Sequence, residues 1–67
     1  MDIRKKFGKR VRAQRLKMNL SQEELAHEAD SNRTYISDVE RGTRNPSIIV
    51  VERIAKVLNK SIGDLLD

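Results

Sequence analysis

Five polar side chains in segment 32–41 are the groups of this chain best suited to recognise another molecule. At 100° per residue along a helix, one face of the segment collects Arg33, Thr34, Ser37, Asp38 and Arg41. Arginine can offer a bidentate fork to guanine O6 and N7, and threonine can exchange a hydrogen bond or place its methyl group against thymine. The combination predicts a helix that reads base edges in the DNA major groove, although a merely solvated outer face would show the same pattern.

Asp38 is the unusual member of this face, because phosphates repel a carboxylate. It would be useful if it accepted a hydrogen bond from cytosine N4 or oriented Arg33, and otherwise it would only be solvated. Tyr35 falls on the flank of the same helix.

Four side chains at the borders of this region could contact the phosphate backbone. Gln22 follows a predicted helix start, where free backbone N–H groups favour a phosphate and the Gln amide adds a donor. Arg41, Arg44 and Asn45 lie at the far end of the segment and in the loop behind it, placed for phosphate or minor-edge contacts. A solvated surface position is the plain alternative for each of them.

Catalytic and metal-binding chemistry finds no support in the sequence. The chain has no Cys, a single His and scattered carboxylates, which do not make a metal-ligand cluster. It also lacks a nucleophile–base pair and a glycine-rich phosphate loop. We therefore expect no enzyme, metal, cofactor or small-molecule ligand. No apolar run approaches the ~20 residues that span a bilayer, and no signal-peptide pattern occurs, so a cytoplasmic protein without membrane contact is expected.

Positive charge is concentrated at the N-terminal end. The 67 residues carry a formal charge of +4, with a pI of about 9.9. Residues 1–20 contain eight basic residues and one acidic residue, whereas residues 21–67 contain six basic and nine acidic ones. The basic end could attract a polyanion irrespective of its sequence, or it could be a solvated helix face. The length allows one small domain, 1–67, for which we expect some stabilisation by a partner subunit.

The elements that must position the polar face are five helices without strands, an all-α fold. Ile3, Phe7 and Val11 recur every four residues, which predicts a buried stripe on a first helix. Ser21 and Glu24 form the S-x-x-E capping box that starts a second helix, which extends through residue 29.

A turn at Asp30-Ser31 leads to the third helix. Asn32 is its predicted N-cap, it runs to about Arg41, and Gly42 closes it in the left-handed conformation that glycine adopts easily. Residues 21–41 are therefore expected to form a helix-turn-helix pair.

Residues 47–66 are expected to supply C-terminal helices for the core and for contact with a second copy. Ser47 is predicted to cap a fourth helix, and Ser61 a short last helix from Ile62 to Leu66. The inward face of the fourth helix is predicted to consist of Ile48, Val51, Ile54, Ala55 and Leu58. Ile49 and Val50 complete an Ile-Ile-Val-Val run that one side cannot bury whole, so they indicate either an exposed interface or further core.

Two opposite charges on inward positions predict an interhelical ion pair. Extending the stripe of the first helix by four residues reaches Arg15, and Glu40 lies at the buried edge of the third helix. A buried charge needs a partner, so the two side chains are expected to pair and fix the first helix against the third. A direct DNA contact by Arg15 is the alternative.

These residues and motifs together resemble the helix-turn-helix domain of the phage-repressor (Cro/CI, Xre-type) family, over nearly the whole chain. The matching motifs are LSQEELA at 20–26, ISDVERG at 36–42, NPS at 45–47, IAKVL at 54–58 and SIGDLL at 61–66. Within that family, the segment NRTYISDVERGTRN at 32–45 looks most like the controller proteins of bacterial restriction–modification systems.

The resemblance implies roles for residues already singled out. It places Arg33, Thr34 and Asp38 at base-reading positions, with Ser37 and Tyr35 near bases or backbone. It places Gln22 at a phosphate-contacting helix start, and it makes Arg15 and Glu40 the family's interhelical ion pair. Controllers are homodimers on near-palindromic operators, joined through C-terminal helices, and the apolar residues available here are Ile49, Val50, Ile62, Leu65 and Leu66.

Three positions depart from the family pattern. Asp30-Ser31 stands where a glycine and an apolar residue are usual, so the turn is expected to form with some strain at Asp30 and with a lost packing contact at Ser31. Lys60 also replaces a common apolar residue.

The expected function is a phage-repressor-like regulator of transcription. A homodimer would occupy a double-stranded DNA operator and could contact RNA polymerase from an upstream site. The alternative is an antitoxin-like or adaptor module whose outer face grips a protein, which would also use the apolar fourth helix.

Overall fold

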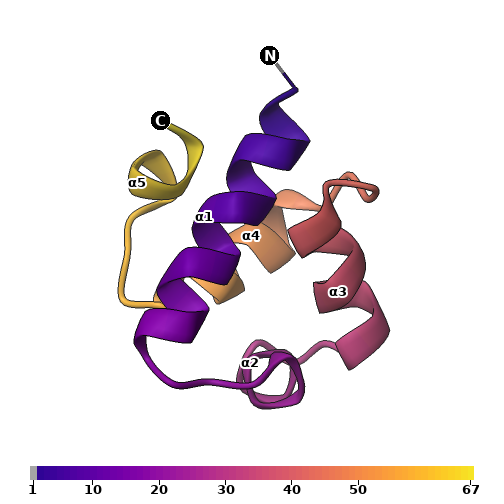
Figure 1. Ribbon diagram of the computed structural model, residues 1–67, viewed down its shortest axis with the longest axis vertical. Helices are drawn as coiled ribbons and strands as arrows, with labels where there is room; N and C mark the ends of the chain where they lie inside the picture. The colour runs from indigo at the N-terminus through magenta and orange to yellow at the C-terminus, as the bar shows by residue number, and fades with distance from the viewer. Residues whose placement is uncertain (1) are drawn as a thin grey trace.

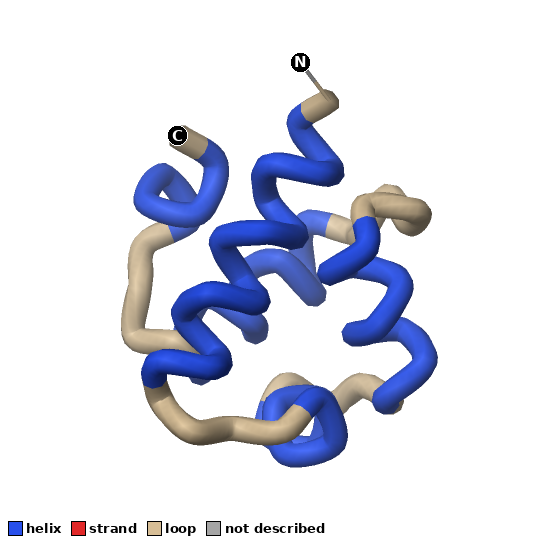
Figure 2. The backbone as a smooth tube through the Cα atoms, viewed as in Figure 1, coloured by secondary structure: helices blue, strands red, loops and turns tan. Residues whose placement is uncertain are grey.

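The computed structural model describes residues 2–67, which form five α-helices and no strands (Figure 1). The helices are α1 Ile3–Lys17, α2 Gln22–Glu28, α3 Arg33–Arg41, α4 Ile48–Val57 and α5 Ile62–Leu66. Figure 2 shows that the connections between them are short loops. The predicted all-α, five-helix fold is confirmed. Among the residues described, no helix is long and apolar enough to cross a membrane.

Each helix begins at a polar side chain that accepts a hydrogen bond from the backbone of the first turn. The predicted N-caps Ser21, Asn32, Ser47 and Ser61 are confirmed, and Asp2 caps α1. A cap of this type stabilises a helix by ~0.5–2 kcal/mol, because it satisfies a backbone N–H that the helix itself leaves free. The helix starts are therefore encoded locally.

Three of the helix exits use left-handed backbone at residues that are not glycine. Asn19, Asp30 and Asn59 have φ values of 58°, 55° and 56°, whereas α3 ends at Gly42 with φ 75°. Asn and Asp tolerate this region better than most residues. The turn expected at Asp30 is therefore confirmed, with the positive φ that this position requires.

Helix α1 is the central element of the core and packs against α3 and α5, while α2 packs against α3 and α4 (Figure 1). The buried apolar side chains are Phe7, Val11, Leu25, Ala26, Ala29, Ile36, Val39, Ile54, Ala55, Leu58 and Leu65. Gly8 permits the close approach of α1 to α3, since a Cβ atom there would lie 2.4 Å from the carbonyl oxygen of Val39. This contact presses the back of α3 against α1 and leaves its other face outward.

Three burial predictions are wrong. Ile3 is 57% exposed and Ile48 is 76% exposed, because each stands in the first turn of its helix, beyond the packed part of the core. Leu65, predicted to be available at a dimer seam, is only 2% exposed, because α5 folds back onto α1 and α4. Ile3 and Ile48 instead border a shallow apolar groove of about 210 Å³.

Candidate nucleic-acid interface

Helix α3 presents two chemically distinct faces, as its sequence predicts. Ile36 and Val39 are buried, together with Glu40. On the other side Arg33 and Thr34 are exposed at the first turn. Ser37 and Asp38 are half-buried, and Arg41 is exposed at the last turn. The outer face therefore begins, at the N-terminal end of α3, with one exposed arginine and one exposed hydroxyl.

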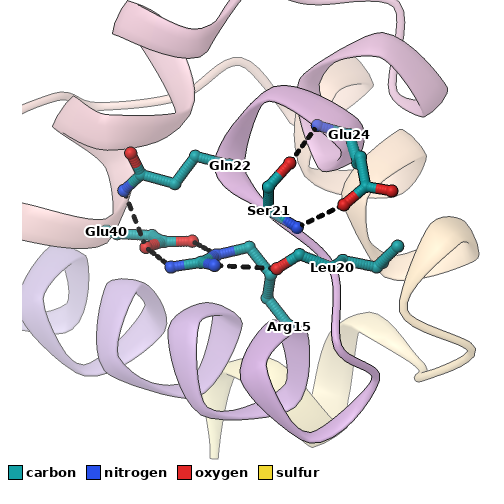
Figure 3. Close-up of polar contacts among 6 residues, drawn as sticks. All are labelled: Arg15, Leu20, Ser21, Gln22, Glu24 and Glu40. Carbon is teal, nitrogen blue, oxygen red and sulfur yellow. Dashed lines mark hydrogen bonds and ion pairs between the residues drawn. The ribbon is translucent and has the colours of Figure 1, made fainter.

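The predicted ion pair between Arg15 and Glu40 is confirmed and anchors α3 to α1 (Figure 3). The Arg15 Nε atom donates to Glu40 Oε2 at 2.6 Å, and Nη2 donates to Oε1 at 3.0 Å. The two residues are 7% and 9% exposed. The third nitrogen of the guanidinium, Nη1, donates to the carbonyl oxygen of Leu20 at 2.8 Å. Hydrogen bonding to Glu40 raises the pKa of Arg15 above its ordinary value.

Gln22 joins this network, which extends it to the start of α2. Its Nε2 atom donates to Glu40 Oε1 at 3.1 Å, on the edge of the carboxylate that faces α2 (Figure 3). An amide nitrogen has two N–H donors, so the bond to Glu40 uses one of them and leaves the other available. The neighbouring capping box is closed in both directions, with Ser21 and Glu24 exchanging bonds of 2.9 and 2.8 Å. Glu40 thus connects α3, which carries the outer face, to both α1 and α2.

Asp38 holds the arginines at the far end of α3, and no bond joins it to Arg33. Its Oδ1 accepts a hydrogen bond from Arg41, and its Oδ2 accepts one from Arg44 Nη2 at 3.3 Å. The hydrogen bond from Arg41 is the main reason that the pKa of Asp38 lies below its ordinary value. The structure therefore shows no bond by which Asp38 would orient Arg33. The prediction of a merely solvated carboxylate is wrong, because both of its oxygens accept hydrogen bonds.

Tyr35 connects the loop after α3 to the helix. The Arg44 guanidinium lies over its ring at 4.6 Å from the centroid, and its hydroxyl oxygen accepts a hydrogen bond from the backbone N–H of Ser47 at 3.3 Å. Thr43 adds a bond from its Oγ1 to the Asp38 carbonyl oxygen at 3.2 Å. No sequence pattern indicates that Thr43 takes part in this region. For the contact between α1 and α3, the sequence signal is Gly8, a glycine inside a helix. Asn45 is exposed beside this cluster.

The residues predicted for a dimer seam separate into three groups. Ile49 is 60% exposed, and Val50, Ile62 and Leu66 are half-buried, so these four leave apolar surface on α4 and α5. Leu65 belongs to the core, as described above. The apolar groove lies between this surface and the start of α1, and Ile62 and Leu66 line it.

Comparison with known proteins places the chain in a family. The model of the helix-turn-helix family matches residues 11–65. The control protein C.BamHI of Bacillus amyloliquefaciens is 57% identical over 67 residues, which cover 98% of this chain and 83% of that protein. Among solved structures, the restriction–modification controller protein C.AhdI from Aeromonas hydrophila matches with a TM-score of 0.88 and 39% identity, over 92% of this chain and 90% of that one.

A structure of a relative with DNA is also similar. The biofilm regulator SinR in complex with DNA matches with a TM-score of 0.86 and 37% identity, over 91% of this chain and 98% of that one. The matches span the same helices whose caps, core and outer face are described above. The chain therefore belongs to the helix-turn-helix family, and control proteins of restriction–modification systems are among its relatives.

Proposed function

We propose that this protein is a sequence-specific, DNA-binding regulator of transcription that acts as the controller of a restriction–modification system. The observation that carries the proposal is the outer face of α3, which exposes Arg33 and Thr34 while its back is locked by the buried Arg15–Glu40 pair. A rigid helix with an arginine and a hydroxyl at its first turn suits insertion into the major groove. The similarity to control proteins supports the more specific role.

The proposed contacts divide by the part of DNA that they meet. Arg33 reads a guanine through its fork, and Thr34 and Ser37 supply hydroxyls to neighbouring base edges. The remaining donor of Gln22, together with Arg41, Arg44 and Asn45, contacts phosphates on either side of the groove. The base contacts would determine which DNA sequence is bound, and the phosphate contacts would fix the position of the protein on the duplex.

A homodimer on a near-palindromic operator is the proposed active form. Two copies would join through the apolar surface of α4 and α5, which includes Ile49, Val50, Ile62 and Leu66. A dimer that places two recognition helices in successive turns of the major groove requires half-sites about 34–36 Å apart, one helical turn. The protein would act by occupancy in the cytoplasm and without catalysis, and polymerase contact would depend on the position of the operator.

Selection from a random duplex library, at two salt concentrations, tests the proposal. We expect recovery of a motif with two-fold symmetry and half-sites about one turn apart. Arg33→Ala provides the matched variant, since it should lose preference at one base of each half-site. Recovery of salt-sensitive binding without any motif would refute the function and favour the alternative, a module that binds a protein through the same faces.

A further inference from the structure

The carboxylate of Asp38 is covered by the two arginines that it binds, while those arginines stay accessible. The Asp38 side chain is 19% exposed, whereas the side chains of Arg41 and Arg44 are 66% and 44% exposed. Both carboxylate oxygens are occupied, one by each arginine. An approaching anion therefore meets the guanidinium groups first.

The cluster has a fixed shape as well as a net charge. Arg44 is held on two sides, by Asp38 and by the ring of Tyr35, and the Tyr35 hydroxyl is tied to the backbone of Ser47. Two positive groups and one negative group leave a net charge of +1 at the end of α3. Without the carboxylate the same place would carry +2, Arg41 would lose its ion-pair partner, and Arg44 would keep only the contact with Tyr35.

We propose, on the basis of the function proposed above, that Asp38 is a specificity-determining residue that competes with DNA phosphates for Arg41 and Arg44. Arg41 and Arg44 are exposed, and ion pairs at a protein surface are weak, so a phosphate can displace the carboxylate or share the arginine with it. Asp38 therefore reduces the attraction of this end of α3 for every duplex. It acts through the two arginines and reads no base itself.

The competition weighs more heavily on arbitrary DNA than on the operator. Phosphate contacts supply essentially all of the affinity for arbitrary DNA, whereas base contacts add to them on the operator. On the operator, the base contacts also fix the position of α3, and an Arg44 that Asp38 and Tyr35 hold in place has less conformational freedom to lose. Removal of the carboxylate should therefore help arbitrary DNA more than the operator.

The substitution Asp38→Asn tests this with little change of shape. Asn keeps the size of the side chain and one carbonyl acceptor, and a carboxylate in the last turn of a helix does not benefit from the helix dipole. If one further phosphate is neutralised, the slope of log K against log salt becomes steeper by about 0.9, which is about an 8-fold gain at 0.1 M salt.

Anisotropy titrations with the selected operator and a scrambled duplex, from about 50 to 200 mM salt, give the measurement. We expect D38N to bind the scrambled duplex about 8-fold more tightly at 0.1 M salt, and its operator preference to fall correspondingly. Asp38→Glu, which keeps the charge, should retain the preference. Glu52→Gln removes an exposed carboxylate from α4 and controls for the change in overall charge.

A double-mutant cycle separates the proposed competition from simple charge loss. In an R41Q/R44Q background, D38N should leave the affinity for the scrambled duplex nearly unchanged. An equal gain in both backgrounds would overturn the proposal, as would an unchanged preference in D38N. Selective loss of operator binding would instead make Asp38 a base-reading residue. A wild-type protein with no operator preference would refute the proposed function itself, and this inference with it.

Discussion

Replacement of Glu40 by alanine should nearly unfold the protein, although glutamate is a residue type that usually lies on the surface. Glu40 is 9% exposed and accepts two hydrogen bonds from Arg15 and one from Gln22. Its loss strands the Arg15 guanidinium, which is 7% exposed, beside an apolar core. Leaving one charge of a buried pair without its partner costs ~3–5 kcal/mol.

That cost is large against the total stability of so short a chain. At ~0.05–0.15 kcal/mol per residue, a 67-residue domain has about 3–10 kcal/mol of unfolding free energy. With a urea m-value of ~1 kcal/mol/M, E40A should lower the midpoint of unfolding by ~3 M or more, or abolish the cooperative transition. Far-UV circular dichroism during urea titration measures the effect.

The double variant R15M/E40L is the control, because it removes both charges and keeps most of the side-chain volume. Such replacements of buried ion pairs are often neutral or stabilise by ~1–4 kcal/mol, so R15M/E40L should be far more stable than E40A. If E40A lost less than ~1 kcal/mol with an unchanged m-value, the pair would not anchor α3 as we argue. If a stable R15M/E40L lost operator binding, that result would support the alternative interpretation, in which Arg15 contacts DNA directly.

Four further perturbations follow from the described contacts. Arg33→Ala should weaken operator binding by ~1–3 kcal/mol and relax the preference at one base, and an equal loss on scrambled DNA would contradict its reading role. Gly8→Ala should cost ~1–3 kcal/mol in urea unfolding, because the added Cβ meets a carbonyl oxygen of α3 at 2.4 Å, and a neutral result would mean that α1 can shift freely. Asp30→Gly should raise the melting temperature, since φ is 55° there and glycine relieves roughly 1 kcal/mol of strain, whereas Asp30→Ala should not. Backbone hydrogen bonds from Ser21 and Ser61 lower the pKa of Glu24 and of Asp64, respectively, so the stability that these carboxylates contribute is present above their ordinary pKa and is lost as the pH falls below it. Glu24→Gln should accordingly be less stable than the wild type at pH 7 and equal to it near pH ~2.5, and a constant difference would exclude this linkage.

The helix starts and the anchoring pair were predictable from sequence because the interactions behind them leave clear patterns. A cap and the backbone N–H that donates to it lie within three residues of each other, so Ser21 with Glu24 or Asn32 with Tyr35 can be recognised without knowing the fold. Arg15 and Glu40 are 25 positions apart, yet each falls on a buried face, and a buried charge requires a partner.

The partners of the polar side chains on the outer face were not predictable in the same way. The sequence predicts Asp38 as a base reader, a support for Arg33 or a solvated carboxylate, and it does not indicate the bonds to Arg41 and Arg44. Arg44 reaches it because the loop after Gly42 turns back over Tyr35. The course of a loop depends on many weak contacts, and no spacing rule encodes it.

Local patterns predict the five helices, the caps of the last four and the two faces of α3, because helix periodicity and capping act over three or four residues. Which apolar residues are covered depends on the tertiary structure. Ile3 and Ile48 lie on inward stripes but are exposed, since they border an open groove at the edge of the core, while Leu65 is buried because α5 returns to α1. Periodicity gives the direction in which a side chain points, and burial depends on whether a distant segment of the chain lies there.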